Sequence, residues 1–208
     1  MTTRAAPPVG IVLAAGAGSR YGMPKALAVG ADGVPWLDRV VAALVAAGCA
    51  PVLVMLGAAP DAPVPGTARP RMVAGWEAGL SSSLRAGLSA AAETDADAAV
   101  LVPVDVPDIP AVVIERLLRA SGGGRRALAR AVFDGRPGHP VVLGRAHWAA
   151  AAATASGDQG AGPYLVRRGA LSVECADLWH GHDVDRAVLR HDEPHDEAGA
   201  ARVRARRC

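Results

Sequence analysis

Apolar runs and amphipathic segments alternate along most of the chain. Residues 9–13, 51–56 and 98–102 are short, continuous apolar runs, which is the pattern of strands buried on both faces of a parallel sheet. Between the first two runs, apolar residues recur at helical spacing over residues 35–47 and stop at Gly48, which predicts an amphipathic helix ended by a glycine. The pattern therefore predicts strand–helix–strand units.

The same alternation continues to about residue 175. Further helices are predicted over residues 79–92, 110–120, 145–154 and 162–168, and further strands over residues 71–73, 127–133, 140–143 and 171–175. The stretch 58–70 is rich in Pro and Ala and is predicted to be a loop. Together these elements predict an α/β fold, a three-layer, Rossmann-like arrangement with a mostly parallel sheet and helices on both faces.

The length of 208 residues predicts one domain. We expect that domain to occupy residues 1–192. Residues 193–208 are charged and rich in Ala and Arg, and they are expected to form a disordered tail.

Charge and hydropathy exclude several functions. The formal net charge of +2 is too small to indicate a nucleic-acid-binding groove. The stretch 40–60 carries no charge, but Gly48 and Pro51 divide it into a helix and a strand, so no membrane span is predicted. Pro7 and Pro8 interrupt the first apolar run and argue against a signal peptide.

The three cysteines are odd in number and far apart in the sequence: Cys49, Cys175 and Cys208. They form no CxxC pair or Cys/His ligand spacing, so neither a disulfide framework nor a structural zinc is indicated. A reducing cytoplasm is the expected compartment.

Small residues and two cations follow the first predicted strand. The backbone of such a loop can approach a ligand closely, and its N–H groups can cradle phosphate oxygens. Arg20 and Lys25 would neutralise a triphosphate. A dinucleotide fingerprint would need a glycine where Tyr21 stands, and the Gly-Lys-Ser/Thr of a P-loop does not occur here. The alternative is a plain strand-to-helix turn that carries two surface cations.

Carboxylates and hydroxyls follow other strands. Asp105 comes directly after the strand at 98–102, where a hard oxygen ligand suits Mg²⁺, whereas Asp108 fits the N-cap of the next helix. The serines at 81–83 open a helix whose free N–H groups could bind an anion, although helix capping is the simpler interpretation. His139 lies in a turn, where bonding to the backbone is the simpler interpretation.

The first loop, read as Leu-Ala-Ala-Gly-x-Gly-Ser-Arg-x-Gly-x-Pro-Lys over residues 13–25, resembles the signature of the MobA-like nucleotidyltransferase superfamily. Within it, the chain is most similar to the molybdenum cofactor cytidylyltransferases, from Val9 to about Leu189. The resemblance implies a nucleotidyltransferase fold in which Arg20 and Lys25 act catalytically on the phosphates of an NTP. The nucleotide-binding residues that it implies are Leu13, Ala14, Ala15, Gly16, Gly18, Ser19, Arg20, Lys25, Gly79, Ser81, Ser82 and Ser83.

The resemblance also implies a metal site and an acceptor site. Asp105, in an Asp-x-Pro segment, would bind Mg²⁺ and act catalytically, and Asp183 would be a second ligand, unless it is only a solvated loop acid. His139 and Asp158 would lie on the acceptor side. The chain departs from the family pattern at Gly162, where Arg is usual, and at 186–189, where the usual Thr-Pro-Glu-Asp is missing.

The function implied is transfer of a CMP moiety from CTP to the phosphate of molybdopterin or the molybdenum cofactor, with release of pyrophosphate. Ala15 supports CTP, because related guanylyltransferases carry glycine there. A transient contact with a molybdoenzyme would follow, with no nucleic-acid or membrane partner. The alternatives are guanylyl transfer to the molybdenum cofactor or to phospholactate, cytidylyl transfer to a sugar or polyol phosphate, and a nucleotide-binding cofactor chaperone without catalysis.

Overall fold

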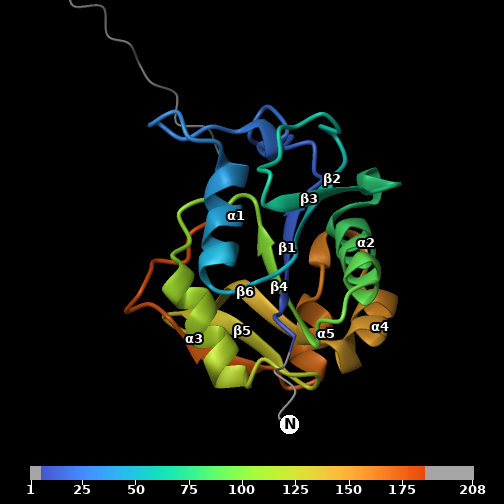
Figure 1. Cartoon of the computed structure of the whole chain (residues 1–208), viewed down its shortest axis with the longest axis vertical. Helices are drawn as coiled ribbons and strands as arrows, with labels where there is room; N and C mark the ends of the chain where they lie inside the picture. The colour runs from blue at the N-terminus through green and yellow to red at the C-terminus, as the bar shows by residue number, and fades with distance from the viewer. Residues whose placement is uncertain (1–5, 186–208) are drawn as a thin grey trace, which may run out of the picture.

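A single seven-stranded sheet runs through the computed structural model, which describes residues 6–185 (Figure 1). The strands are β1 (Val9–Ala14), β2 (Val52–Leu56), β3 (Ala68–Met72), β4 (Ala98–Pro103), β5 (Leu128–Phe133), β6 (Arg136–Gly144) and β7 (Leu171–Glu174). Their order across the sheet is β3-β2-β1-β4-β6-β5-β7. Among these seven strands only β6 runs antiparallel to its neighbours, β4 and β5. The sheet is therefore mostly parallel, as the apolar runs predict.

Helices cover both faces of the sheet (Figure 1). They are α1 (Trp36–Ala46), α2 (Leu80–Ala92), α3 (Ala111–Ser121), α4 (Arg145–Thr154) and α5 (Gly162–Arg167), with three short 3₁₀ turns, η1 (Lys25–Leu27), η2 (Trp76–Ala78) and η3 (Gly157–Gln159). Helices α1 and α3 pack on one face, and α2, α4 and α5 pack on the other. This arrangement confirms the predicted three-layer α/β fold.

Strand β1 shows how the sequence builds the two layers. All six of its residues are buried, and successive side chains point to opposite faces. Val12 packs with the α1 and α3 layer, whereas Ile11 packs with α2. A Cβ on Gly87 of α2 would lie 2.8 Å from Cγ2 of Ile11, so a glycine is needed for α2 to pack this closely on the strand. The tight packing fixes the carboxyl end of β1, where the first loop begins.

Two strands have bounds that differ from the prediction. Strand β3 begins at Ala68, inside the predicted loop 58–70, and includes Pro70. The strand lies at the edge of the sheet, where a residue without an N–H group is tolerated. Strand β6 begins at Arg136 rather than at residue 140, because Asp134 and Gly135 make a two-residue turn with φ of 50° and 73°. Such a turn lets both strands pair right up to it.

The predicted side-chain caps are wrong. Helix α2 starts after Gly79 with no side-chain cap, because the N-cap residue is a glycine and the serines 81–83 lie inside the helix. Helix α3 starts after Pro110, also without one. The Asp108 carboxylate instead accepts a hydrogen bond from Arg39 of α1 at 2.6 Å. Long-range ion pairing therefore replaces the local capping that the sequence favours.

Two further expectations concern a membrane span and the C-terminal residues. No helix in the described part of the chain is both long and apolar enough to cross a membrane. The predicted tail, residues 193–208, lies outside the described residues, as do residues 186–189.

Cys49 is buried at the end of α1, and burial raises the pKa of its thiol to about 12. A thiol with a raised folded-state pKa stabilises the fold below its unfolded pKa of about 8.5 and loses that contribution as the pH rises. We therefore expect the free energy of unfolding to fall between about pH 8.5 and pH 12, by at most about 1.4 kcal/mol per pH unit from this group. Urea melts between pH 7 and pH 11 would measure it. If the free energy of unfolding of Cys49→Ala falls with pH as steeply as that of the wild type, the Cys49 thiol does not cause the fall.

Candidate active site

The loop after β1 folds on itself through its own backbone. The N–H groups of Tyr21 and Gly22 donate to the carbonyl oxygen of Gly18, at 2.9 and 2.8 Å. Gly18 has φ +63°, and a Cβ there would overlap the carbonyl oxygen of Met23. Gly16, in contrast, is exposed, and a Cβ there would meet nothing within 4 Å. Gly18 is therefore required by the fold of the loop, whereas Gly16 faces open space.

This contrast separates folding from ligand binding. Gly18→Ala should distort the loop and lower the melting temperature, because the substitution is strained by both φ and close contact. Gly16→Ala should leave the melting temperature of the free protein unchanged and weaken nucleotide binding, if the backbone approaches the phosphates there. Thermal melts with and without CTP and Mg²⁺ measure both effects. Equal CTP binding by the Gly16→Ala variant and the wild type would argue against phosphate contact at this point.

Of the other residues predicted to bind nucleotide in the first loop, some are buried and some are exposed. Leu13, Ala14 and Ala15 are buried, so the alanines can meet a ligand only through their backbone. The Ala15 carbonyl already accepts a hydrogen bond from the N–H of Ala58 at 2.9 Å. Ser19 and Arg20 are exposed. Their nucleotide-binding roles stay predictions.

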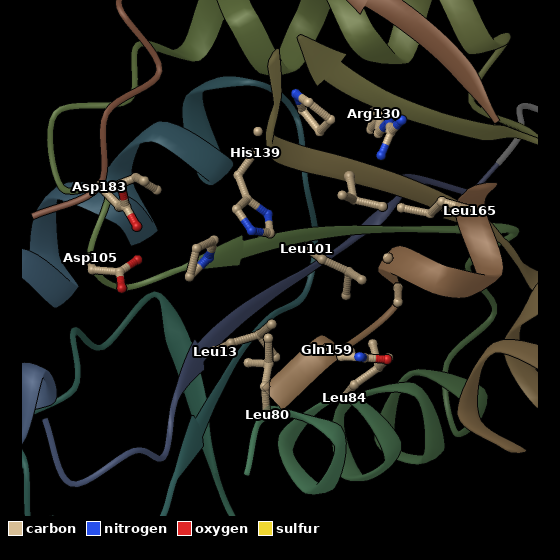
Figure 2. A pocket seen from close by; sticks show the side chains of 18 of the residues that line it. Leu13, Leu80, Leu84, Leu101, Asp105, Arg130, His139, Gln159, Leu165 and Asp183 are labelled. Carbon is tan, nitrogen blue, oxygen red and sulfur yellow. The ribbon is translucent and has the colours of Figure 1, made fainter. Parts of the chain in front are cut away.

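A cavity of about 420 Å³ lies beside the loop, between the sheet and the helices α2 and α5 (Figure 2). Leucine side chains make its apolar walls: Leu13, Leu80, Leu84, Leu101 and Leu165. Asp105 and Asp183 lie at one end, Arg130 lies toward the other, and His139 lies between them (Figure 2). The cavity can therefore hold an apolar or flat group with polar ends.

His139 enters the cavity from β6. Its Nδ1 atom is buried and has no hydrogen-bond partner among the residues that the structure describes. Burial lowers the pKa of the imidazole, and the carboxylates of Asp105 and Asp183 oppose that shift. The neutral ring can accept or donate a hydrogen bond to a bound molecule. His139 thus lines the cavity, and its expected place on the acceptor side stays a prediction.

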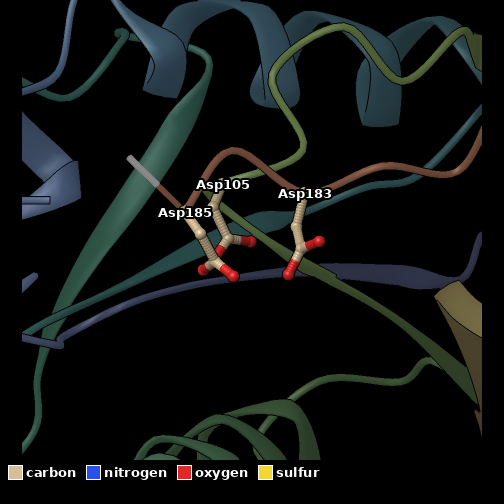
Figure 3. A group of neighbouring side chains, drawn as sticks. All are labelled: Asp105, Asp183 and Asp185. Carbon is tan, nitrogen blue, oxygen red and sulfur yellow. The ribbon is translucent and has the colours of Figure 1, made fainter. Parts of the chain in front are cut away.

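Three carboxylates gather at the mouth of the cavity (Figure 3). Asp105 follows β4, and Asp183 and Asp185 come from the segment after β7, 78 residues or more later in the chain. The N–H of Val184 donates to the carbonyl oxygen of Asp105 at 2.8 Å, which holds the two segments together. One oxygen from each carboxylate lies within 4.8 Å of the others.

Lys25, the only lysine of the chain, reaches this group from the first loop. Its Nζ lies 3.0 Å from Oδ2 of Asp105 and 3.4 Å from Oδ1 of Asp185. The Lys25 side chain is 15% exposed and that of Asp105 is 23% exposed. The cation of the loop and the carboxylate after β4, which the sequence singles out separately, thus meet at one point.

The three carboxylates fit a divalent cation. A Mg²⁺ or Mn²⁺ ion bonds to carboxylate oxygens at about 2.1 Å, which holds neighbouring ligand oxygens about 3 to 4 Å apart. The observed spacing needs only a small adjustment to reach that geometry. The group holds three carboxylates and one ammonium group, which pairs with Asp105 and Asp185, so a negative excess is left that a divalent ion would balance.

Sequence reasoning selected Asp105 and Asp183 for this site and missed Asp185. The signal was present, because Asp183 and Asp185 form an Asp-x-Asp pair. An extended backbone would send alternate side chains to one side. Asp183 and Asp185 are both exposed, and the Asp185 side chain is 56% exposed.

The serine segment and Asp158 lie together at the start of α2. Ser81 is buried, and its Oγ accepts a hydrogen bond from Arg85 at 3.2 Å. Gly79 has φ +95°, and a Cβ there would overlap the carboxylate of Asp158. Asp158 therefore lies against the N-terminus of α2, while its neighbour Gln159 lines the cavity. The nucleotide contacts of Gly79 and Ser81–Ser83 and the acceptor contact of Asp158 stay predictions.

Comparison with known proteins places this chain in a family. A curated relative, nicotine blue oxidoreductase of Paenarthrobacter nicotinovorans, is 35% identical over 188 residues, which cover 85% of this chain and 91% of the relative. The crystal structure of Rv0371c from Mycobacterium tuberculosis H37Rv is similar with a TM-score of 0.70 and 26% identity, covering 88% of this chain and 95% of that one.

A second structure of Rv0371c, a complex with manganese, has a TM-score of 0.63 and 24% identity, covering 81% of this chain and 89% of that one. At that identity it supports the fold alone. The model of the MobA-like NTP transferase domain matches residues 10–173, well over half of the chain. The chain therefore belongs to the MobA-like NTP transferase family.

Proposed function

We propose that this nucleotidyltransferase transfers a CMP moiety from CTP to the phosphate of molybdopterin or the molybdenum cofactor and releases pyrophosphate. The observation that carries the proposal is a group of three carboxylates at the mouth of an apolar cavity, two of which, Asp105 and Asp185, pair with Lys25. The loop would hold the triphosphate on one side of the carboxylates, and the cavity would hold the acceptor on the other.

The reaction needs positioning and charge neutralisation more than covalent catalysis. An oxygen of the acceptor phosphate forms a bond to the α-phosphorus of CTP. The bond from that phosphorus to the oxygen bridging to the β-phosphate breaks, and its electron pair leaves with pyrophosphate. The acceptor phosphate is already ionised at neutral pH, so no strong general base is required. Arg20 and Lys25 would stabilise the negative charge that grows on pyrophosphate.

Asp105, Asp183 and Asp185 would hold the divalent cation. When bound, Mg²⁺ neutralises phosphate charge next to the reacting phosphorus. Rv0371c forms a complex with manganese, which supports the proposal of a divalent ion in this chain. Asp105 is the main candidate because it is fixed by β4 and by the backbone bond from Val184. Magnesium is the expected ion, because carboxylates and phosphates are its preferred ligands.

The cavity supports an acceptor with a flat, mostly apolar body. Leucines from the sheet, α2 and α5 surround it, and Asp105 and Asp183 mark the end where the acceptor phosphate would face the nucleotide (Figure 2). A pterin ring carrying a phosphate on a short side arm has this shape. A sugar or polyol phosphate would leave the leucine walls facing hydroxyl groups, which makes it the weaker alternative.

A screen of nucleotides tests the proposal. A ligand present at 100 times its Kd raises the free energy of unfolding by roughly 2.7 kcal/mol. We expect CTP with Mg²⁺ to raise the melting temperature more than GTP, ATP or UTP, and pyrophosphate to appear only when a molybdopterin-type acceptor is added. A larger shift with GTP would favour guanylyl transfer. Nucleotide binding without pyrophosphate release would favour a cofactor chaperone.

The curated relative favours one second candidate, an oxidoreductase, since a 35% identical protein carries that name. In this case the apolar cavity would hold an aromatic substrate and the loop would hold a nucleotide that donates a hydride. Oxidation of NADH or NADPH by the same preparation, in the presence of a quinone-like dye, would be the positive result. Pyrophosphate release from CTP without such oxidation would rule against it.

A further inference from the structure

Arg130 places a positive charge inside the apolar cavity, at a distance from the carboxylates. It lies on β5, opposite Val141 of β6 and Ser172 of β7. Its neighbours Ala129 and Ala131 point to the α1 and α3 layer, so the alternation of the strand turns Arg130 toward the other face. There it lines the cavity together with Val141 and Leu165 (Figure 2).

The guanidinium of Arg130 has no partner of its own in residues 6–185. It makes no hydrogen bond or ion pair there, and its Nε atom is buried without an acceptor. The other arginines that reach into the fold are paired: Arg85 donates to Ser81 and Ala155, and Arg145 donates to backbone carbonyls. A buried N–H without an acceptor costs free energy, which a ligand oxygen would recover.

The carboxylates that could neutralise Arg130 are at the opposite end of the cavity. Asp105 and Asp183 are the acids that line it, and His139 stands between them and Arg130 (Figure 2). The acceptor phosphate must face Asp105 to meet the nucleotide. Arg130 is therefore placed to meet a different part of the same molecule.

We propose that Arg130 is a specificity-determining residue that binds the ring carbonyl of a pterin-type acceptor, at the end remote from the reacting phosphate. This inference rests on the proposed function, whose acceptor it specifies. The planar, five-donor guanidinium suits a carbonyl at the edge of a heterocycle, as it does the carbonyl edge of guanine. The leucine walls cover the faces of the ring, and Arg130 fixes its orientation.

The test uses a fluorescent ring without phosphate, 6-hydroxymethylpterin, and its analogue 2,4-diamino-6-hydroxymethylpteridine, in which an amino group replaces the ring carbonyl. Titrations without CTP give the Kd of each ring for the wild type, Arg130→Met, Arg130→Lys and the control Arg69→Met. Arg69 is exposed on β3 at the far edge of the sheet. A melting curve of each variant checks that it folds.

The wild type and Arg69→Met should bind the pterin roughly 10- to 100-fold more tightly than the diamino analogue. Arg130→Met should lose this preference. Arg130→Lys should keep part of it, because lysine retains the positive charge but lacks the planar set of N–H donors of the guanidinium. In turnover assays Arg130→Met should raise KM for the acceptor by a similar factor and leave KM for CTP unchanged.

The inference is overturned if the wild type binds neither ring, if it binds both rings equally, or if Arg130→Met keeps the preference. The proposed function fails by a different result, the absence of CMP transfer from CTP to any molybdopterin-type acceptor. Ring preference that depends on Arg130, without transfer, would support the inference and contradict the proposed function.

Discussion

Asp105→Asn is expected to lower pyrophosphate release from CTP by about 10³-fold and to remove its dependence on Mg²⁺. Asparagine keeps the size of the side chain but removes the negative charge that would hold the ion and that faces Lys25 at 3.0 Å. The measurement is the initial rate of pyrophosphate release across a Mg²⁺ titration. Asp108→Asn is the matched control, since Asp108 lies three residues further along the same segment and pairs with Arg39 instead.

The control should keep the rate and the Mg²⁺ response of the wild type. A normal Mg²⁺ titration in Asp105→Asn would show that the ion is held by other groups. Asp183→Asn and Asp185→Asn should have smaller effects than Asp105→Asn, because both residues are exposed whereas Asp105 is half-buried.

Lys25→Met is expected to have two opposite effects. It should lower turnover by about 10²-fold, because it removes the charge that we propose stabilises the leaving pyrophosphate. It should also tighten the binding of Mn²⁺ to the free protein, roughly tenfold, because the ammonium no longer repels a cation from Asp105 and Asp185. Steady-state kinetics measure the first effect, and titration of Mn²⁺ by electron paramagnetic resonance measures the second.

Arg119→Met, on the exposed side of α3, serves as the control for loss of one positive charge. It should change neither the turnover nor the affinity for Mn²⁺. Weaker Mn²⁺ binding in Lys25→Met would mean that the lysine orders the carboxylates rather than competing with the ion, and unchanged turnover would remove Lys25 from catalysis.

The sequence predicted the central part of the fold because its signals are local. Strands β1, β2 and β4 are apolar on both faces, and α1 carries a clear helical stripe that ends before Gly48. These elements form where expected. Strand β3 is different, because its exposed Arg69 and its proline follow no apolar pattern. It is a strand because it pairs with β2 at the edge of the sheet, which the local sequence does not indicate.

The site could be predicted only in part, for the same reason. Lys25 and Asp105 each follow a recognisable local pattern, and each was selected. Their contact depends on the pairing of β1 with β4, and the contact of both with Asp185 depends on a segment that returns after β7. Arg130 carried no signal at all, since a charged residue in a half-buried strand reads as solvent-exposed until the strand order places it over the cavity.

The central claim is that the first loop and the carboxylates of Asp105, Asp183 and Asp185 bind one nucleotide and one divalent ion together. The most direct measurement is an anomalous difference map from crystals soaked with Mn²⁺ and a non-hydrolysable CTP analogue. If they do, one strong manganese peak should appear among the three carboxylates, with triphosphate density along residues 15–25. A manganese peak elsewhere, or nucleotide density away from this loop, would contradict it.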